Sequence, residues 1–519
     1  MKKLIALTLA TVMLLALCAC GGGNAGGSSD VSYDIPEGKQ IPDDAVVDIT
    51  IASHASWPYE EDWKVWEYIK EAIGGTVNVS AIPATDFATK FPLIMAVPED
   101  LPDLINFQGK PSGFANYCRQ GAFLAFDDYL EYLPDYVEFW ENVPEDEKWM
   151  QNVRRTDNGK IYYSPTHGLE RSTNIRGWLY RKDIFDKHGL KAPETMEELY
   201  NVSKKLKELY PDSYPFCVRS GLSNLSVIGS SWKPNFHTGV YYDFENEKWC
   251  YGASEGVMYE MVEFFNRMVS EKLVPADFFN INTASWQELV STDRGFIFPE
   301  YQVRIDFFNN IGRVSNPDYT IAACLPPRAE NGTGINMLNK YNFVPAGYAI
   351  CNTGDEGAIA NAFRVINWFY TDEATELVSW GKEGETYEIV DGEKKFIMDD
   401  SNENVQTLYG FNTLGTHIRH APDSIDASIS EEQAAVTDFL LENTYPHLDP
   451  TMYMEFTSEQ SAELSDLNTS IATFVNENIQ KFIIGQKPLS EWDTFQKELS
   501  ELNLERVLEI YEEAYNAIK

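Results

Sequence analysis

The chain is poor in basic residues and in cysteine for its length. Among 519 residues it has 41 Lys and Arg against 80 Asp and Glu, a formal net charge of −39 at pH 7. A surface this acidic repels phosphate groups, so we exclude nucleic acid as a partner and expect no polybasic membrane patch. The composition, 44% hydrophobic and 13% aromatic, is that of a globular protein. The length favours two to four domains or one large bilobed unit.

Motifs for catalysis and metal binding are missing from the sequence. There is no GxSxG, HExxH or Walker loop, and the 7 His are scattered without metal-ligand spacing. We therefore predict no catalytic residue, no metal site and no cofactor. Five of the 7 Cys lie beyond residue 20, irregularly spaced and without a CxxC pair, so we expect buried free thiols and leave one disulfide open. These are Cys118, Cys217, Cys250, Cys324 and Cys351.

Beyond the N-terminus the chain has no uninterrupted run of eighteen apolar residues, so nothing else is predicted to span a bilayer. At the N-terminus two lysines precede an apolar stretch over 4–17, which has the proportions of a secretion signal. The stretch ends in Leu-Cys-Ala-Cys, which resembles the bacterial lipoprotein processing box. We predict a signal peptide over 1–19 and lipidation of Cys20, palmitate being one acyl group, with acylation of Cys18 or a signal cleaved without lipid as open alternatives. Residues 20–45 then form a lipidated tether, rich in Gly and Ser, at the outer face of the cytoplasmic membrane.

Strand-like and helix-like segments alternate from residue 46 onward. Alternating or continuous apolar patterns predict strands over 46–51, 76–82 and 103–107, with helices over 60–72 and 86–95 between them. Strand, helix, strand, helix, strand predicts a parallel sheet, in which ligands bind beyond the carboxyl ends of the strands. The alternation continues to the C-terminus without internal repeats, which favours two interleaved α/β lobes over separate domains.

A series of motifs in fixed order is similar to one protein family. They are the strand end 102–105, the segments 159–165, 178–183 and 193–199, the GxEGxxY element at 381–387, and the C-terminal segments 481–485 and 510–515. Over nearly the whole mature chain they resemble the extracellular solute-binding proteins (family 1) of bacterial carbohydrate ABC transporters, in the long lipoprotein branch.

The resemblance implies an α/β fold of the two-lobed periplasmic-binding-protein type (type II). Each lobe would be a mixed sheet flanked by helices, with the ligand cleft between the lobes. It implies lobe I over 46–174 and 300–352, and lobe II over 175–299 and 353–519. The segment 207–215 lacks the spaced carboxylates that alginate-binding members use for calcium, so we do not expect that ion there.

The same resemblance implies a monomeric receptor that captures an oligosaccharide by lobe closure and delivers it to the membrane subunits of an ABC permease. A surface glycoside hydrolase stays open, because among 80 acids some pair will fall at the required spacing of about 5–10 Å. A non-transport lectin or adhesin and a peptide receptor of the same fold are further alternatives.

A sugar site needs an aromatic platform and planar polar side chains. The candidates lie in loops at predicted strand ends, near the hinge crossing, at the GxEGxxY element and in a Gly-rich loop. For the Trp residues among them the alternative is core packing, and for the Arg residues it is ion pairing at the surface. The acidic surface disfavours uronic acids at long range, although a local Arg could override it. The candidates are Trp57, Tyr59, Gln108, Trp178, Trp232, Phe236, Glu300, Tyr301, Arg304, Trp380, Glu383, His417 and Arg419.

Overall fold

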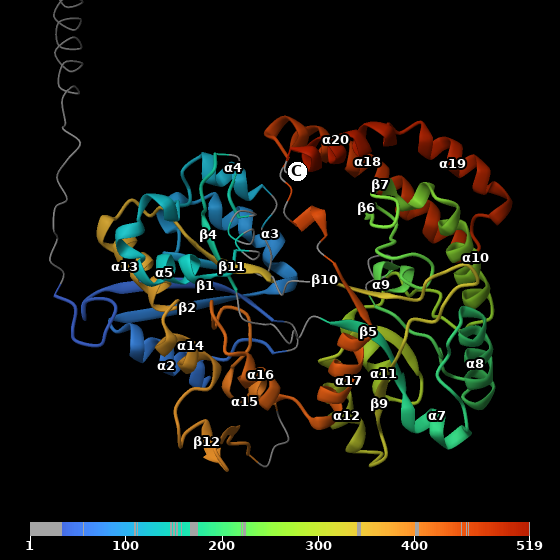
Figure 1. Cartoon of the computed structure of the whole chain (residues 1–519), viewed down its shortest axis with the longest axis horizontal. Coiled ribbons are helices and arrows are strands. Elements are labelled where there is room, and N and C mark those ends of the chain that lie inside the picture. The colour runs from blue at the N-terminus through green and yellow to red at the C-terminus, as the bar shows by residue number, and fades with distance from the viewer. Residues whose placement is uncertain are drawn as a thin grey trace, which may run out of the picture.

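Two lobes lie side by side in the computed structural model of the chain, and Figure 1 shows them to the left and right of its centre. Cys20, Gln108 and most of the predicted tether lie outside the described residues. The structure describes residues 34–54, 57–107, 111, 113–145, 148, 151, 154–156, 158–166, 175–219, 221, 225–339, 344–399, 404–447, 449–452, 454 and 456–517.

Lobe I is built on a five-stranded sheet with the order β2-β1-β3-β11-β4. β1 pairs in parallel with both β2 and β3, which confirms the parallel arrangement predicted from the alternation. β11 then runs antiparallel between β3 and β4. Every residue of β3 is buried, as expected for a strand covered by helices on both faces. The strands are β1 (Val46–Ser53), β2 (Thr76–Pro83), β3 (Leu104–Phe107), β4 (Tyr163–Thr166) and β11 (Val344–Ile350).

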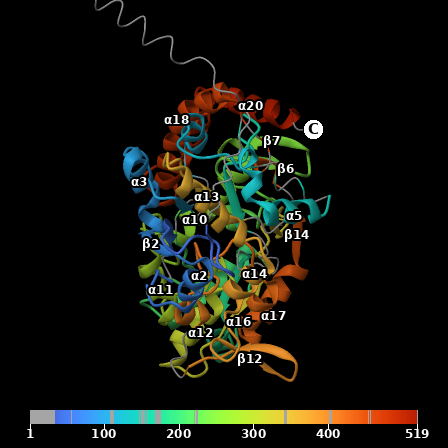
Figure 2. The same cartoon turned by 90° about the vertical axis from the view of Figure 1, so that its left-hand side faces the viewer.

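Helices from two separate stretches of the chain, 64–142 and 356–428, belong to this lobe, which faces the viewer in Figure 2. α2 turns Val65, Trp66 and Ile69 inward at helical spacing. The hairpin of β12 (Tyr387–Val390) and β13 (Glu393–Phe396) also belongs to this lobe. The helices are α2 (Lys64–Ile73), α3 (Ala84–Met95), α4 (Phe114–Arg119), α5 (Pro134–Asn142), α13 (Glu356–Trp368), α14 (Asp372–Ser379), α15 (Val405–Tyr409) and α16 (Pro422–Ser428).

Lobe II contains a three-stranded antiparallel sheet with the order β8-β5-β9. Its core joins α8 and α10 to the C-terminal helices, so residues 471–510 pack against residues 196–269. The strands are β5 (Arg176–Arg181), β8 (Ile297–Tyr301), β9 (Ile321–Cys324), the hairpin β6 (Val240–Asp243) and β7 (Lys248–Tyr251), and the pair β10 (Asn336–Asn339) and β14 (Thr444–His447). The helices are α7 (Lys182–His188), α8 (Met196–Leu209), α9 (Leu225–Gly229), α10 (Gly256–Ser270), α11 (Thr283–Ser291), α12 (Arg304–Arg313), α17 (Glu431–Glu442), α18 (Ser458–Ile483), α19 (Trp492–Ser500) and α20 (Leu504–Asn516).

The lobe boundaries differ from the expected ones. We expected 300–352 in lobe I, but β8 pairs with β5 and α12 packs under the same sheet, so most of this segment belongs to lobe II. We expected 353–519 in lobe II, but α13 and α14 bury their apolar faces in the lobe I core. The cause is that the chain returns to lobe I at β11 and stays there through α16 before it joins lobe II again at α17.

The chain therefore passes between the lobes three times. The passages lie between Thr166 and Ile175, between Asn339 and Val344, and between Ser428 and Glu431. Several short segments linking two lobes are typical of a hinge. The two-lobed α/β fold is thus confirmed, with interleaved segments but with different boundaries.

The five cysteines beyond residue 20 are free and buried, as predicted. Burial raises the pKa of the Cys217 thiol well above its ordinary value, which makes it inert. Among the described helices, none combines the length and the apolarity that a bilayer crossing requires.

Candidate functional site

The strand ends of the two lobes meet at one junction. In lobe I, the register of β11 places the carboxyl ends of β3 and β4, at Phe107 and Thr166, on the same edge of the sheet. The next strand along the chain, β5, belongs to lobe II. There the first residue of β5, Arg176, pairs with Tyr301 at the carboxyl end of β8. The edge of each sheet where ligands usually bind therefore faces the other lobe.

The lobe I rim of this junction, defined by Ser53, His54, Trp57 and Tyr59, is aromatic. The rings of His54 and Trp57 stack with centroids 4.6 Å apart and planes inclined by 20°. Trp57 is half-buried, so part of its ring stays accessible. Two contacts hold Tyr59 in place. Its backbone N–H donates to Ser53 Oγ at 2.8 Å, and its ring packs edge-on against Trp66, with centroids 6.2 Å apart. Of the predicted lobe I residues, Trp57 is the better-placed platform for a sugar ring.

The lobe II rim, defined by the strand-end residues 175–177, 216–219 and 300–304, is basic and polar. Glu300, at the end of β8, accepts two bonds from Arg219, at 2.5 Å from Nε and 3.0 Å from Nη2. The Arg176 guanidinium lies 4.0 Å from the centroid of the Tyr301 ring. Three predicted residues, Glu300, Tyr301 and Arg304, thus share one rim with two that we did not predict.

The two rims interact electrostatically. Burial, assisted by the positive charges of Arg304 and Arg219, lowers the pKa of His54 to about 4. Since His54 belongs to lobe I and both arginines to lobe II, this coupling crosses the junction. At neutral pH His54 is therefore an uncharged imidazole that can both donate and accept a hydrogen bond. Burial and the neighbouring Arg219 lower the pKa of Arg304, while Glu300 opposes that change.

Four predicted aromatic residues are packed in the cores instead. Trp178 is fully buried on β5 and stacks on Phe216 at 5.5 Å. Phe236 is fully buried in the lobe II core, and Trp232 is 7% exposed and packs edge-on against Phe264. Trp380 is 1% exposed and stacks on Phe396 at 4.7 Å. Because their ring faces are covered by protein, the expectation that they stack on a ligand is corrected for this conformation.

Glu383 and His417 also lie apart from the two rims. Glu383 is exposed in the loop after α14, next to Lys382, which pairs with Glu71 of α2 at 2.5 Å. His417 is buried, with its ring 5.1 Å from that of His420. Burial lowers the pKa of His417 to about 4. His417 is therefore an uncharged residue that packs against His420 within the loop that covers β1.

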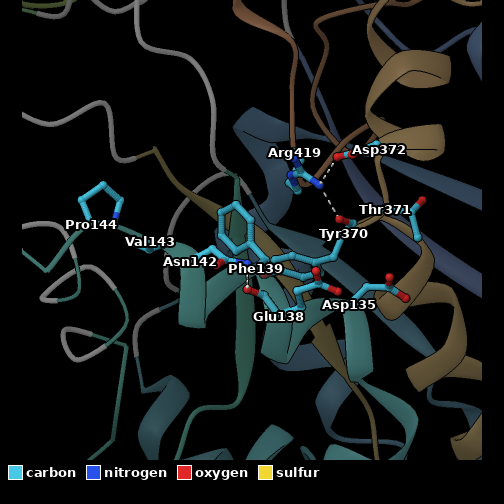
Figure 3. Close-up of a pocket in the computed structure, with 10 residues that line it drawn as sticks. All are labelled: Asp135, Glu138, Phe139, Asn142, Val143, Pro144, Tyr370, Thr371, Asp372 and Arg419. Atoms are coloured by element: carbon cyan, nitrogen blue, oxygen red, sulfur yellow. Dashed lines mark hydrogen bonds and ion pairs between the residues drawn. The ribbon is translucent and has the colours of Figure 1, made fainter.

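Arg419 lines a pocket of about 470 Å³ formed by lobe I alone (Figure 3). Its Nη1 donates to the Tyr370 carbonyl at hydrogen-bond distance and to Asp372 Oδ1 at 3.1 Å, and its guanidinium lies 5.2 Å from the Phe139 centroid. Figure 3 shows Asp135 and Glu138 on the wall below. Since every lining residue belongs to one lobe, a ligand here would not couple to lobe closure. We therefore place the candidate site at the junction.

The described residues offer no grouping of three or more His, Cys, Asp or Glu side chains that could hold a metal ion. In the segment 207–215, the Lys207 ammonium donates to the Ser213 carbonyl at 2.6 Å. A positive group there disfavours a cation, in line with the absence of spaced carboxylates.

Sequence reasoning missed His54, Arg176 and Arg219. His54 and Arg219 each follow a segment that reads as a strand, so a rule naming every polar strand-end residue would have found them. Arg176 opens β5, and only its register against Tyr301 brings it to the rim. No local signal in the sequence distinguishes it from other arginines.

Comparisons with curated proteins give distant relatives. Lipoprotein LipO of Bacillus subtilis (strain 168) is 25% identical over 343 residues, which cover 62% of this chain and 64% of LipO. The polygalacturonan/rhamnogalacturonan-binding protein YtcQ of the same strain is 28% identical over 206 residues, 39% of this chain and 38% of YtcQ. The matches thus span less than two thirds of either relative.

Solved structures share the fold over nearly the full length. The alginate-binding protein AlgQ2, solved without calcium ion, superposes with a TM-score of 0.75 at 19% identity, covering 92% of this chain and 99% of AlgQ2. FusA of S. pneumoniae, an ABC-transporter substrate binding protein in complex with kestose, gives a TM-score of 0.73 at 17% identity, covering 91% and 99%. The family described as bacterial extracellular solute-binding protein matches residues 60–376, more than half of the chain. The protein therefore belongs to the bacterial extracellular solute-binding protein family.

Proposed function

We propose that this protein is the extracellular receptor of an ABC importer, and that it captures an oligosaccharide between its lobes and delivers it to the permease. The observation that carries the proposal is the junction itself. An aromatic rim with Trp57 and a neutral His54 faces a rim of planar polar groups, Glu300 and Arg304, across two sheet edges. Such a pairing matches a sugar ring, which has an apolar face and a fringe of hydroxyls.

Three passages of the chain between the lobes support a closing motion. A ligand that contacts both rims binds the closed form more tightly than the open form, and it shifts the population toward closure by that difference in affinity. A permease that recognises the closed form would then take only loaded receptor. No covalent step is part of this proposal, and the receptor acts as a monomer.

The names of the relatives fit a sugar ligand. YtcQ is named for binding polygalacturonan and rhamnogalacturonan, FusA is named as a fructooligosaccharide ABC transporter substrate-binding protein, and AlgQ2 is named for binding alginate. LipO is named as a lipoprotein, which agrees with the predicted acylation of Cys20. We propose that this acyl group holds the chain at the outer face of the cytoplasmic membrane.

A thermal-shift screen of the purified full chain tests the receptor proposal. Neutral oligosaccharides, uronic-acid oligomers and peptides form the panel. Ligand at 100 times its dissociation constant stabilises the folded state by about 2.7 kcal/mol, which raises Tm by a few degrees. Small-angle X-ray scattering should show a smaller radius of gyration with the same ligand. A response to peptides alone would contradict the proposed sugar ligand but not the fold. Release of shorter sugars during incubation would contradict the receptor role and favour a hydrolase.

The anchor is tested separately in the intact bacterium. Wild-type protein should sediment with membranes, and mass spectrometry should find acyl groups on Cys20. The Cys20→Ala variant should be released or left unprocessed, and membrane retention of a cleaved Cys20→Ala protein would contradict the anchor.

A further inference from the structure

The third passage between the lobes is the shortest, and the structure describes all of it. α16 ends at Ser428 and α17 begins at Glu431, so Ile429 and Ser430 join a lobe I helix to a lobe II helix (Figure 1). Both residues have an extended backbone, with φ and ψ of −110° and 151° at Ile429 and of −70° and 159° at Ser430. Rotation in such a short link changes the angle between two helices without breaking their internal hydrogen bonds.

The lobe I end of this link is fixed to its lobe through α16. The indole N–H of Trp380, in the lobe I core, donates to Asp423 Oδ1 in the first turn of α16 at 3.3 Å. Just before the helix, the Ala421 N–H donates to Ser379 Oγ at 2.9 Å. Ile425, in the middle of α16, is 2% exposed. We therefore expect α16 to move with lobe I.

A carboxylate holds the lobe II end of the link. Asp306, in the first turn of α12, accepts the Ser430 N–H through Oδ2 at 2.9 Å and the Ser430 hydroxyl through Oδ1. Ser430 Oγ itself accepts the Gln433 N–H at 3.0 Å, which makes Ser430 the N-cap of α17. The Asp306 N–H in turn donates to Gln433 Oε1 at 3.4 Å. These three residues, named here the Asp306 clamp, tie the start of α17 to α12.

Further contacts of α12 and α17 fix the clamp within lobe II. Arg313 donates to both carboxylate oxygens of Glu432, at 2.7 and 2.8 Å, and Asn309 Nδ2 donates to the same carboxylate at 3.1 Å. Asn309 Oδ1 also accepts the Ile321 N–H of β9 at 2.9 Å. The helix that carries the clamp is therefore bonded to the lobe II sheet as well as to α17.

The clamp is also next to the lobe II rim in the chain. α12 begins at Arg304, a rim residue, two positions before Asp306. The rim residue and the clamp thus share the first turn of one helix, whose backbone hydrogen bonds make it move as a unit. A ligand that displaces this turn would displace the start of α17 with it.

We propose that Ile429 is the pivot of lobe closure and that Asp306 is the positioning residue that fixes the lobe II side of this pivot. The inference rests on the proposed receptor function and concerns how its site closes. Because Asp306 holds the Ser430 N–H, the peptide unit before Ser430 moves with lobe II, and the rotation falls on the Ile429 backbone. Without the carboxylate the start of α17 frays, and the lobes sample a wider range of relative positions. A ligand then loses more conformational entropy when it closes them.

Distances between the lobes of the ligand-free full chain test this proposal. Spin labels are attached to azide-bearing amino acids that replace Ile389 in lobe I and Glu208 in lobe II, two exposed side chains. A second pair, at Glu208 and Val314, reports on lobe II alone. In Asp306→Ala, pulsed dipolar spectroscopy should give an inter-lobe distance distribution about twofold broader than in the wild type. The distribution within lobe II should keep its wild-type width.

Matched variants separate the clamp from a general loss of helix capping. Ser430→Ala removes two of the clamp's hydrogen bonds and should also broaden the inter-lobe distribution, which keeps the test decisive if Asp306→Ala does not fold. Asp355→Ala is the control, because the Asp355 carboxylate caps α13 inside lobe I, where it accepts the N–H groups of Gly357 and Ala358. Asp355→Ala should keep the wild-type inter-lobe width. With the sugar found by thermal shift, Asp306→Ala should bind about fivefold more weakly and Asp355→Ala as the wild type does.

The possible failures can be told apart. Inter-lobe distributions of wild-type width in both Asp306→Ala and Ser430→Ala would contradict the pivot. Equal broadening of the pair within lobe II, or equal broadening in Asp355→Ala, would also contradict it, since the effect would then be a general loosening. These distances are measured without ligand. A chain that binds no sugar would therefore contradict the proposed function, while the distances would still decide whether Asp306 fixes the pivot.

Discussion

The two rims of the junction both lie at sheet edges, but one is aromatic and uncharged and the other is basic and polar. Both lie at a sheet edge that faces the other lobe, but the lobe I rim presents Trp57 stacked on His54, whereas the lobe II rim presents Arg304 beside the Arg219–Glu300 pair and Arg176, the first residue of β5, on the Tyr301 ring. Stacking is tolerant of sugar identity, while charge pairing is selective. Under the proposed function, a sugar ring would stack on the lobe I rim and meet the polar groups of the lobe II rim, so only the closed form would make both contacts.

The largest expected effect is a loss of stability, which should distinguish aromatic residues of the cores from those of the rims. Trp232→Ala removes a side chain that is 7% exposed and packed on Phe264, which leaves a cavity in lobe II. We expect a loss of unfolding free energy of about 3–5 kcal/mol. Urea denaturation measures it, with Val314→Ala, which truncates a side chain that is 90% exposed after α12 in the same lobe, as the control. A fully stable Trp232→Ala protein with weak sugar binding would instead restore Trp232 to the site.

The next effect concerns the fixed pair of the lobe II rim. Arg219→Ala leaves the buried Glu300 carboxylate without its bidentate partner, which should cost about 3 kcal/mol of stability. Arg294→Ala breaks an exposed pair with Glu288 and should cost less than about 1 kcal/mol. Equal losses in the two variants, measured by chemical denaturation, would mean that Glu300 does not depend on Arg219.

A third test uses pH and the lobe I rim. The pKa of His54 is about 4 in the folded protein, below the ordinary 6.5, so between these values the unfolded chain binds the extra proton. This contribution to stability is complete above pH 6.5 and is lost as the pH falls toward 4. Relative to His54→Gln, the wild type should therefore lose about 2 kcal/mol between pH 7 and pH 5. Parallel denaturation curves at each pH check this, and a constant difference would show that His54 is not shielded from protons.

The smallest effect should be on affinity alone. Trp57→Ala removes the half-buried platform and should weaken the bound oligosaccharide about tenfold, or about 1.4 kcal/mol. Its salt dependence should stay that of the wild type, because no charge is removed. Titration at two salt concentrations measures both quantities. A changed salt slope in Trp57→Ala would contradict a stacking role for this ring.

Much of the fold could be predicted from local patterns. The alternation over 46–107 gave the parallel strands β1, β2 and β3. The lobe boundaries could not be predicted this way. Whether β8 joins one sheet or the other depends on its pairing with β5, which is far away in the sequence.

The candidate site residues also fall into two groups, those that local sequence patterns could identify and those that only tertiary contacts decide. Trp57, Glu300, Tyr301 and Arg304 could be chosen because they follow strand-like segments, and the structure brings them to the two rims. Trp178, Trp232, Phe236 and Trp380 have the same residue types but are covered by core neighbours. The sequence does not distinguish an aromatic residue whose ring faces a ligand from one whose ring packs on a Phe, because burial depends on tertiary contacts.

By itself, the sequence determined the acidity of the protein, its N-terminal export and anchoring signals as predictions, the first three strands with the two helices between them, and the resemblance to solute-binding proteins. The acidity, the signals and the first strands and helices follow from composition and short-range patterns, and the resemblance follows from motifs in a fixed order. Only the tertiary structure decided which segments share a lobe, which aromatics stay accessible, and that Arg219 and Arg304 lie near His54. Arg219 and Arg304 act together on His54, and Arg176 reaches Tyr301 only through the β5–β8 register, so no local rule encodes this arrangement.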